Sequence, residues 1–445
     1  MTNIARVSEN TLNTRRVPII FVPGVMGSRL HFTDIDQYWD PDSNLEMWHW
    51  VNVDAEKEMW ELEFAAPAEV MTDQENEDLT EDENWRGWAG VAWRSYGEFL
   101  RWLGKFSFSP AICPLYCVGY DWRQSNLTSG KYLASAIANV LADAKAEKVI
   151  LLTHSMGGLV ARSAMKANPA LEKQVLGVVH TVQPAAGAVV LYRRFFTGAL
   201  GYLEGGGLFS TILGNTAAKF GAIMSGLPGP MELLPTRDLR DNDDLNWMSY
   251  KKDGETCHWP GNVYDLYRGK TVPPGLPVSD VSKYAHSMLI KLLNNAEVFH
   301  HKWLNGYKHP KTWTIFGTGV ATDTSIVFDP GLRRPAHLEN WGDDQVVYVP
   351  DDYGVQMRRT NQGDGTVPRM SAESLFPHNL GKQDRKPSSF VWEDDDTLRQ
   401  YPVIGAEHEP AYKDDSVKEL VYFMIRYFLL KDDLSQLHHR LTEKK

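Results

Sequence analysis

The stretch of residues 148–165, KVILLTHSMGGLVARSAM, constrains the fold of this 445-residue chain more than any other. Its first six residues form the short apolar run of a buried strand, and the apolar spacing of a helix begins after the small residues Gly157 and Gly158. Ser155 stands at the junction. A strand that turns sharply into a helix at a serine is typical of a nucleophile elbow, where small neighbours let the helix pass close to the strand.

Two interpretations of Ser155 are open on these residues alone. As a nucleophile, it would lie at the positive end of the following helix, which favours negative charge developing beside it. As a capping residue, it would only accept a hydrogen bond from the first turn of that helix. Thr153 occupies the position of the first glycine in the usual GxSxG pattern, so the segment THSMG does not by itself decide between them.

Apolar runs and amphipathic stretches alternate around this segment. Residues 17–22 form a continuous apolar run that ends in the Gly-containing turn 23–28, residues 111–123 form a second run, and residues 175–182 follow the elbow helix. Helical spacing is found at residues 96–103 and 131–144. Such alternation predicts βαβ units with right-handed crossovers. The expected fold is therefore α/β, with a mostly parallel, doubly wound sheet.

The limits of the regular pattern predict the domain organisation. Residues 1–184 are expected to form the first part of the core, with a lid loop at about residues 40–92. Residues 185–310 are Gly-rich, aromatic and irregular, which indicates a cap or lid insertion over the active site. The strand pattern resumes near residue 312, so residues 311–431 are expected to complete the core and residues 432–445 to form a polar tail.

The composition is that of an ordinary globular protein, with 43% hydrophobic and 23% charged residues. A net charge of −11 argues against nucleic acid as a partner. The first residues lack the apolar stretch of a signal peptide, and glycines and prolines interrupt the apolar residues 199–230 before a membrane span of about 20 residues can form. The default expectation is a cytoplasmic protein without a transmembrane helix, with leaderless secretion as the other possibility.

A serine hydroxyl becomes an effective nucleophile only when an imidazole takes its proton and a carboxylate orients that imidazole. In α/β hydrolases the three groups come in the chain order Ser, acid, His, on loops after successive strands. His408 fits this order because it follows a short apolar run and precedes an expected helix at residues 417–430. A surface-loop histidine is the alternative. His154 is expected to point away from its neighbour Ser155 and to be structural.

For the acid, Asp364 is flanked by Gly363 and Gly365, a tight turn that can present a carboxylate without steric hindrance. Such turns are also common on surfaces. The rival carboxylates nearby are Asp343, Asp344, Asp351 and Asp352.

An oxyanion hole needs two backbone N–H groups aimed at the developing charge. Met156, directly after the serine, is expected to supply one, and Val25 in the turn 23–28 the other, with Met26 as its rival. The same turn could instead be a plain connection without a catalytic duty.

No metal or organic cofactor is called for. The histidine pairs at 300–301 and 438–439 lie on polar helical stretches without the carboxylate and histidine spacing of a zinc site, and they are expected to be solvated.

Six segments, in order along the chain, resemble the lecithin:cholesterol acyltransferase family, which includes phospholipases and phospholipid:diacylglycerol acyltransferases. They are FVPGVMGSRL (21–30), GYDWR (119–123), LLTHSMGG (151–158), IFGTGVATDTS (315–325), GDGTVP (363–368) and the His408 segment. The resemblance implies an α/β-hydrolase fold with a cap and lid. It also implies a triad of Ser155, Asp364 and His408, and it favours Val25 as the oxyanion donor.

This resemblance implies an acyl-enzyme on Ser155 formed from a lipid ester, with glycerophospholipid as the expected donor and acylglycerol second. Release to water would make the chain a phospholipase or lipase, and release to a lipid alcohol an O-acyltransferase; hydrolysis is the expectation because water is always present. Transient contact with a membrane surface is implied. Two alternatives are a leaderless exported antibacterial lipase, with a protein inhibitor or export partner, and a non-catalytic lipid-binding protein on a hydrolase scaffold.

Overall fold

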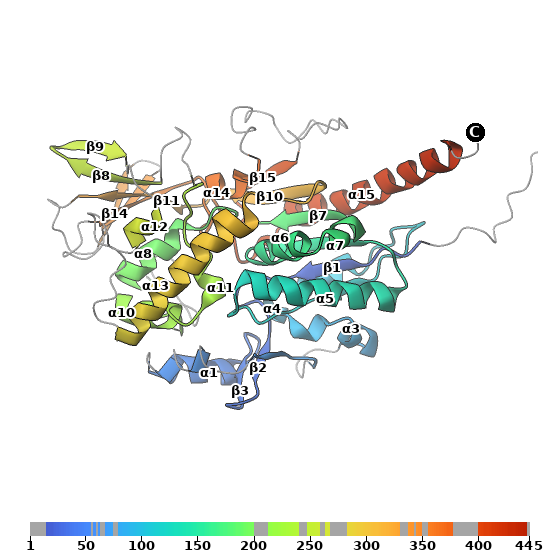
Figure 1. The fold of residues 1–445 in the computed structure, drawn as a ribbon, viewed down its shortest axis with the longest axis horizontal. Coiled ribbons are helices and arrows are strands. Elements are labelled where there is room, and N and C mark those ends of the chain that lie inside the picture. The colour runs from blue at the N-terminus through green and yellow to red at the C-terminus, as the bar shows by residue number, and fades with distance from the viewer. Residues whose placement is uncertain are drawn as a thin grey trace, which may run out of the picture.

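A parallel six-stranded sheet forms the centre of the molecule (Figure 1). The computed structural model describes residues 15–54, 57–58, 61–62, 67–73, 79–199, 212–239, 247–258, 263–267, 283–329, 337–341, 344–348, 355–376 and 399–442. The strand order is β15-β10-β7-β6-β1-β5, and every neighbouring pair is parallel. The strands are β1 (Ile19–Val22), β5 (Leu115–Cys117), β6 (Val149–His154), β7 (Val175–Thr181), β10 (Thr312–Thr318) and β15 (Gln400–Ile404).

Helices cover both faces of this sheet, and the side chains of β1 show how the faces differ. Ile20 and Val22 belong to the apolar core shared with α5 (Asn126–Ala144) and α6 (Gly157–Ala167). Ile19 and Phe21 belong to the core shared with α4 (Trp93–Leu103) and α15 (Asp415–Thr442). Strands buried on both faces explain the continuous apolar runs of the sequence. The predicted doubly wound α/β architecture is confirmed.

The connections place the crevice of the sheet between β1 and β6. The chain leaves β1 through α4 to reach β5 on one side, and returns through α5 to β6 on the other side of β1. Because α4 and α6 lie on opposite faces, the turns that follow β1 and β6 diverge at the carboxyl ends of these strands. Ligands of open α/β sheets bind at such a switch point. The turn 23–28 and Ser155 both lie there.

The predicted strand at residues 111–123 is only partly formed, because β5 contains three residues. The rest of that segment, including GYDWR, has no regular strand structure and ends in a turn. The expected helix at 131–144 begins five residues earlier, at Asn126, where the Ser125 side chain accepts a hydrogen bond from the Thr128 amide and caps it.

A second sheet of six strands packs beyond the edge of the first, in the order β12-β13-β14-β11-β8-β9. Its strands are β8 (Met248–Lys252), β9 (Glu255–His258), β11 (Thr322–Phe328), β12 (His337–Trp341), β13 (Asp344–Tyr348) and β14 (Val355–Thr360). It therefore combines strands from both sides of residue 311, where the sequence predicted a domain limit. That limit stays a prediction.

The helices of residues 185–310 and the short helices of the core complete the fold. The first group is α8 (Val189–Thr197), α10 (Ala217–Met224), α11 (Pro228–Met231), α12 (Val263–Tyr267), α13 (Lys283–Val298) and the π-helix Phe299–Leu304. The second group is α3 (Glu81–Trp85), α7 (Pro169–Gln174), α14 (Arg369–Glu373) and two 3₁₀ turns, Trp88–Gly90 and Ala411–Lys413. Helix α13 crosses the front of the molecule beside α11 (Figure 1).

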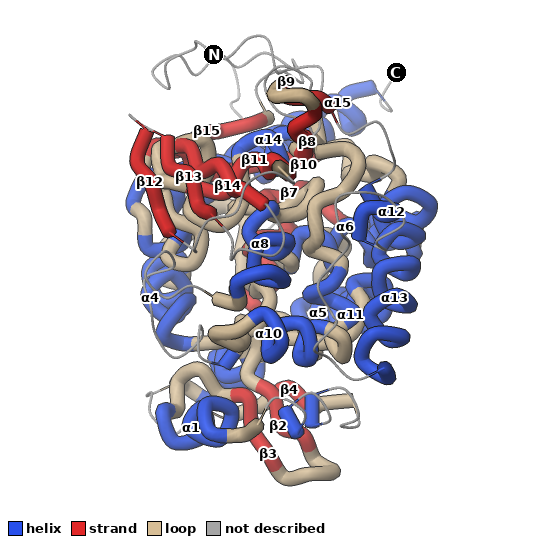
Figure 2. Tube along the Cα trace, turned by 90° about the vertical axis from the view of Figure 1, so that its left-hand side faces the viewer, coloured by secondary structure: helices blue, strands red, loops and turns tan. Residues whose placement is uncertain are grey.

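A small antiparallel sheet lies at the opposite end from the second sheet, as both views show (Figures 1 and 2). It consists of β3 (Gln37–Trp39), β2 (Leu30–Phe32) and β4 (Glu69–Val70), and it packs with α1 (Asn44–Asn52). Of these elements, α1 and β4 come from residues 40–92, which the sequence predicted as a lid loop, and β2 and β3 precede that segment.

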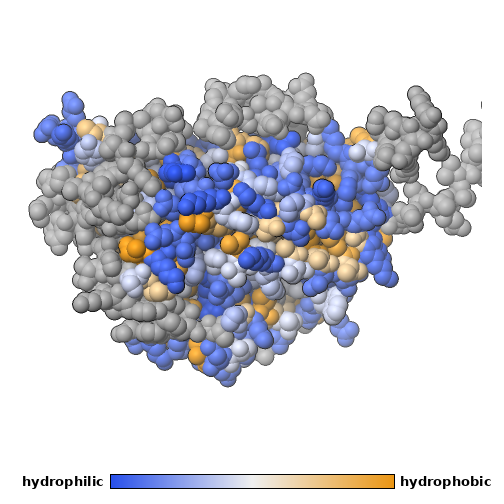
Figure 3. Space-filling view, in the orientation of Figure 1, coloured by the Kyte–Doolittle hydropathy of each residue, from blue (hydrophilic) through white to orange (hydrophobic). Residues whose placement is uncertain are grey.

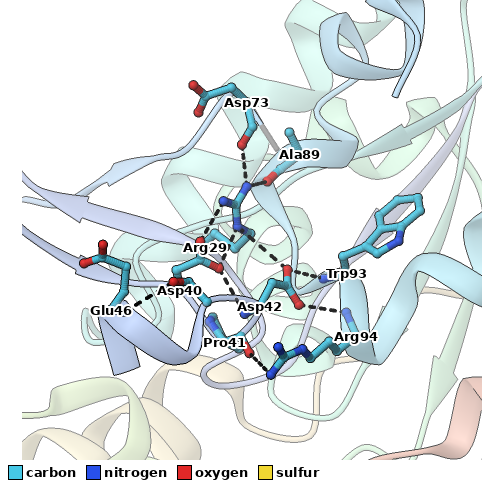
Figure 4. A network of polar contacts seen from close by, with 10 residues as sticks. Arg29, Asp40, Pro41, Asp42, Glu46, Asp73, Ala89, Trp93 and Arg94 are labelled. Atoms are coloured by element: carbon cyan, nitrogen blue, oxygen red, sulfur yellow. Dashed lines mark hydrogen bonds and ion pairs between the residues drawn. The ribbon is translucent and has the colours of Figure 1, made fainter. Parts of the chain in front are cut away.

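A buried polar network ties this small sheet to α4 (Figure 4). The Arg29 guanidinium binds both carboxylate oxygens of Asp40, at 2.9 and 2.8 Å, and lies 3.8 Å from Asp42. Asp42 in turn accepts hydrogen bonds from the Trp93 and Arg94 amides, the first two of α4. A carboxylate at a helix N-terminus is stabilised by the helix dipole. The start of α4 is therefore anchored to the small sheet.

The surface seen in Figure 3 is mostly hydrophilic, with apolar residues in scattered patches. Within the described part of the chain, no helix has both the length and the apolar character needed to cross a bilayer.

Candidate active site

Ser155 lies in the turn between β6 and α6 with a φ of 50°, in the left-handed region that non-glycine residues seldom adopt. Its amide donates to the Thr181 carbonyl at 2.9 Å, which ties the turn to β7. Strain of this kind concentrates at functional sites. The turn has the backbone of the predicted nucleophile elbow.

The two glycines after Met156 are needed for close packing. A Cβ on Gly157 would lie 2.4 Å from the Pro23 carbonyl oxygen, and one on Gly158 would lie 2.5 Å from the Gln183 side chain. Both distances are far below van der Waals contact. At position 157 the obstacle is backbone, so only glycine lets α6 approach the turn after β1 this closely, and at position 158 a side chain would have to displace Gln183. The packing role predicted for these glycines is confirmed.

His408 joins Ser155 to Asp364. Its Nε2 lies 2.9 Å from Ser155 Oγ, and its Nδ1 lies 2.9 Å from Asp364 Oδ2. The other oxygen of Asp364 accepts from the Thr366 and Val367 amides at 3.0 and 2.7 Å. A carboxylate held in this way keeps Nδ1 protonated and leaves Nε2 free to take a proton from the serine. The structure thus brings together the three side chains that the sequence singled out.

Glycines also bring the acid and the histidine loops together. Gly365 has a φ of +94°, which the turn around Asp364 requires. On β10, a Cβ on Gly317 would lie 2.0 Å from the Ala406 carbonyl oxygen and 2.7 Å from Asp364 Cβ. Gly317 therefore lets both loops pack against the end of β10, a role that the sequence analysis did not assign.

The backbone amides next to Ser155, from the turn after β1 and from Met156, differ in their hydrogen-bond partners. The Gly24 amide donates to the Tyr96 hydroxyl at 3.2 Å. The amides of Val25, Met26 and Met156 have no hydrogen-bond partner among the residues that the structure describes. Free N–H groups from the turn after β1 and from the residue after the serine are what an oxyanion hole needs. Val25 and Met26 both remain candidates on this ground.

The GYDWR segment holds the turn after β1 in place. The Tyr120 hydroxyl donates to the Pro23 carbonyl at 3.1 Å, and the Tyr120 amide donates to Ser28 Oγ at 2.9 Å. Trp122 packs edge-on against Trp39, whose indole N–H donates to the Met26 carbonyl at 3.2 Å. The turn is therefore fixed by the core on one side and by the small sheet on the other.

Thr153, the residue in place of the usual glycine, faces β7. Its hydroxyl lies 2.8 Å from His180 Nδ1, its register partner on that strand. Burial lowers the pKa of His180 well below its ordinary value, with the charges of Arg162 and His309 adding to the effect, so the ring is neutral. Thr153 thus makes a buried polar contact with a neighbouring strand, which a sequence motif cannot reveal.

The histidine pair at 300–301 makes its polar contacts away from the Ser155–His408–Asp364 cluster. His300 is buried, not solvated as expected, and its Nε2 donates to the Glu232 carbonyl at 2.6 Å. His301 also has little exposed side-chain surface and lies 3.4 Å from Asp238. Both belong to the π-helix, whose packing against the core the polar sequence did not predict. The side chains of His438 and His439 lie outside the described residues.

Of the rival acids, Asp344 begins β13, and Asp343, Asp351 and Asp352 lie outside the described residues. Within the described ranges, no group of three or more His, Cys, Asp or Glu side chains is arranged to hold a metal ion.

Comparison with known proteins supports this description. Residues 89–262 match the family model of lecithin:cholesterol acyltransferase, which confirms the resemblance over that range and supports lipid-ester chemistry in general. No curated protein matches the chain.

Among solved structures, a chain of the Tle4-Tli4 complex matches with a TM-score of 0.68 and 20% identity, over 93% of this chain and 98% of that one. The Bacillus licheniformis lipase BlEst2 in its mature form matches with a TM-score of 0.32 and 12% identity, over 92% and 91% of the two chains. The first match shows a shared α/β-hydrolase fold; the TM-score of the second is too low to add to it.

Proposed function

We propose that this α/β-hydrolase, which matches the lecithin:cholesterol acyltransferase family over residues 89–262, is a serine lipid-ester hydrolase of the phospholipase A or lipase type. The observation that carries the proposal is the position of His408, 2.9 Å from both Ser155 Oγ and Asp364 Oδ2. A capping serine on a connecting turn would need neither contact.

In the proposed mechanism, His408 Nε2 takes the proton of Ser155 as the serine oxygen attacks the ester carbonyl. Asp364 stabilises the imidazolium that forms. The amides of Val25 and Met156 hold the negative oxygen of the tetrahedral intermediate, each contributing about 3 kcal/mol or more in enzymes of this kind. His408 then gives its proton to the leaving alcohol, and the acyl group remains on Ser155.

The acyl-enzyme can be released by water or by a lipid alcohol. We propose hydrolysis as the main reaction and O-acyl transfer as a side reaction, because transfer needs a bound acceptor and exclusion of water. The proposed acyl donor is a glycerophospholipid, with acylglycerols second.

Labelling with a fluorophosphonate probe tests the nucleophile. The wild-type protein is expected to label and Ser155→Ala is not, while Asp364→Asn and His408→Ala should lower turnover by about four orders of magnitude and leave folding intact. An unlabelled wild-type protein would refute the proposal, and active His408→Ala would refute the assigned base.

Mass spectrometry of the products from mixed phospholipids, with and without an added alcohol, identifies the donor, the bond cleaved and the acceptor. Fatty acid as the main product in both conditions supports hydrolysis. An acylated alcohol as the main product would instead assign the chain as an acyltransferase. The same assay excludes a non-catalytic lipid-binding protein if any Ser155-dependent product is found.

A second candidate is an exported antibacterial lipase that a protein inhibitor neutralises. The fold match to a chain of the Tle4-Tli4 complex is the observation that favours it, since that protein was crystallised with a partner. Expression directed to the periplasm of a test bacterium should then cause growth arrest with the wild-type protein and none with Ser155→Ala. Growth unaffected by the wild-type protein would contradict this candidate and leave the hydrolase proposal standing.

A further inference from the structure

Two side chains outside the triad connect the segments from which the site is built. Tyr96 lies on α4, and His154 is the last residue of β6, directly before Ser155. The Tyr96 hydroxyl lies 3.2 Å from the Gly24 amide and 3.0 Å from His154 Nδ1. His154 Nε2 lies 2.9 Å from the backbone carbonyl oxygen of His408. This chain of contacts runs from the turn after β1 to the loop that carries His408.

The chemistry of the groups leaves one arrangement of the protons. The Gly24 amide can only donate, so the Tyr96 oxygen accepts from it and directs its own hydrogen to His154 Nδ1. The His408 carbonyl can only accept, so His154 carries its proton on Nε2. A neutral imidazole satisfies both demands, and burial lowers the pKa of His154 to about 3, which keeps it neutral.

The fold makes these contacts possible through strand alternation. Thr153 and His154 are neighbours on β6, so they point to opposite faces of the sheet. Thr153 faces His180, and His154 faces α4, where its ring packs edge-on against Tyr96. The turn after β1 comes so close that a Cβ on Gly24 would lie 2.8 Å from His154 Nδ1.

The far end of the chain of contacts reaches the acid. The His408 amide donates to the Asp364 carbonyl at 2.8 Å, so the backbone of His408 is held by Asp364 on one side and by His154 on the other. His154 and Asp364 thus fix the backbone from which the His408 ring extends to Ser155. Neither Tyr96 nor His154 touches Ser155 Oγ in any contact of the described structure.

We propose that Tyr96 and His154 are positioning residues, which together fix the turn that carries the oxyanion donors relative to the backbone of His408. The inference rests on the proposed serine-hydrolase function. It extends that function to the spacing between the amides of the turn 23–28 and the His408 ring, which both act on the transition state. Without the His154 donor, the partly buried His408 carbonyl would lose its partner and the loop would shift to find another. Misplacement of a catalytic group by about 1 Å lowers turnover by about a hundredfold.

Three variants separate the two ends of the contact chain. Tyr96→Phe removes the hydroxyl that holds Gly24 and His154. His154→Asn retains an acceptor near the Nδ1 position and cannot reach the His408 carbonyl, whereas His154→Gln retains a donor that can. Tyr96→Phe and His154→Asn are expected to lower kcat on a soluble p-nitrophenyl ester about tenfold to a hundredfold, with KM changed by less than about threefold. His154→Gln is expected to recover kcat to within about fivefold of wild type.

Tyr412→Phe is the matched control. The Tyr412 hydroxyl donates to the Thr153 carbonyl at 3.1 Å, and its ring belongs to the same core cluster as Tyr96 and lies 5.9 Å from the His154 ring. Phenylalanine retains this ring contact, and the hydroxyl that is removed bonds neither Gly24 nor His154 nor His408 in the described structure. Both Phe variants therefore lose one buried hydroxyl. They should lose similar thermal stability, and only Tyr96→Phe should lose kcat.

The rate of fluorophosphonate labelling of Ser155 gives a second readout that needs no substrate. It should fall in Tyr96→Phe and stay unchanged in Tyr412→Phe. Equal kcat and labelling rates in Tyr96→Phe and wild type would overturn the inference, and so would an equal loss in both Phe variants. These results differ from failure of the proposed function, in which the wild-type protein itself would not label. Should His154→Asn not fold, the comparison of the two Phe variants decides the matter.

Discussion

Glu232 is a carboxyl group buried at the end of α11, and its ionisation is expected to make the protein less stable in mild alkali. Its Oε2 accepts hydrogen bonds from the backbone amide and the side-chain amide of Asn126, both at 2.7 Å. Burial outweighs these two contacts and raises the pKa of Glu232 from 4.5 to about 8. The group is therefore protonated in the folded protein at neutral pH and ionised in the unfolded chain.

The sign and size of the effect follow from proton linkage. Because the folded pKa lies above the unfolded one, the folded protein holds the extra proton, and the contribution to stability is lost as the pH rises from 4.5 through about 8. The complete shift corresponds to about 5 kcal/mol at most, of which about 2 kcal/mol is lost between pH 6 and pH 8. Burial also raises the pKa of Glu58 to about 8, so the wild-type protein should lose more than Glu232 alone accounts for.

Glu232→Gln isolates this contribution, because the amide oxygen can still accept from Asn126. The free energy of unfolding, measured in urea at pH 6, 7 and 8, should fall more steeply for wild type than for the variant, by about 2 kcal/mol over the range. Glu419→Gln is the control, since Glu419 is exposed on α15 and water solvates its carboxylate in both states. A difference between wild type and Glu232→Gln that does not change with pH would refute the reasoning, because it would mean that the folded protein binds no extra proton at Glu232.

Three further predictions concern the network of Figure 4, the turn 23–28 and the stability of the protein in acid. Arg29→Ala leaves the buried Asp40 and Asp42 carboxylates without their cation. The free energy of unfolding, measured in urea, should fall by about 3–5 kcal/mol. A loss below about 1 kcal/mol would mean that the two carboxylates are not buried in the way that the structure shows. Gly24→Ala places a Cβ 2.8 Å from His154 Nδ1 and 3.1 Å from Ser155 Cβ. The turn must shift to avoid these contacts, so kcat should fall about tenfold or more while the melting temperature changes little. A variant with the kcat of wild type would mean that the turn can move without affecting turnover. Burial lowers the pKa of both His154 and His300 from 6.5 to about 3, so the unfolded chain binds more protons and stability should be lost as the pH falls from 6.5 towards 3. His300→Gln should reduce this loss, measured by urea unfolding between pH 4 and 7. The same dependence on pH in wild type and His300→Gln would show that His300 is already protonated in the folded protein.

Much of the candidate site could be predicted from the sequence, because its parts are marked by residues that are close together along the chain. The elbow around Ser155 is a strand, a turn and a helix within 18 residues, and each has a sequence signature of its own. Asp364 and His408 were found because the hydrolase chain order restricts the choice and because glycines flank the aspartate. The structure brings these three side chains together at hydrogen-bond distance, while their catalytic roles and the domain limits stay predictions.

Contacts between segments that are far apart along the chain could not be predicted from the sequence. Tyr96 lies 58 residues from His154 and 72 from Gly24, and nothing near Tyr96 along the chain marks it as different from other tyrosines. His300 lies on a polar stretch and is nevertheless buried, because the π-helix packs its ring against the Glu232 backbone. The second sheet also combines strands from the cap segment and from the returning core.

The sequence by itself determined the alternation of strands and helices in the core, the α/β fold and the choice of Ser155, Asp364 and His408 as candidates for the site. Apolar periodicity and glycine turns act between near neighbours, so they can be recognised without knowing the rest of the chain. Only the tertiary structure decided which groups are buried and which polar atoms pair across elements. Those properties set the pKa values of Glu232 and His154 and the spacing between the turn 23–28 and His408. Desolvation and hydrogen bonding depend on atoms that are brought together from distant parts of the chain.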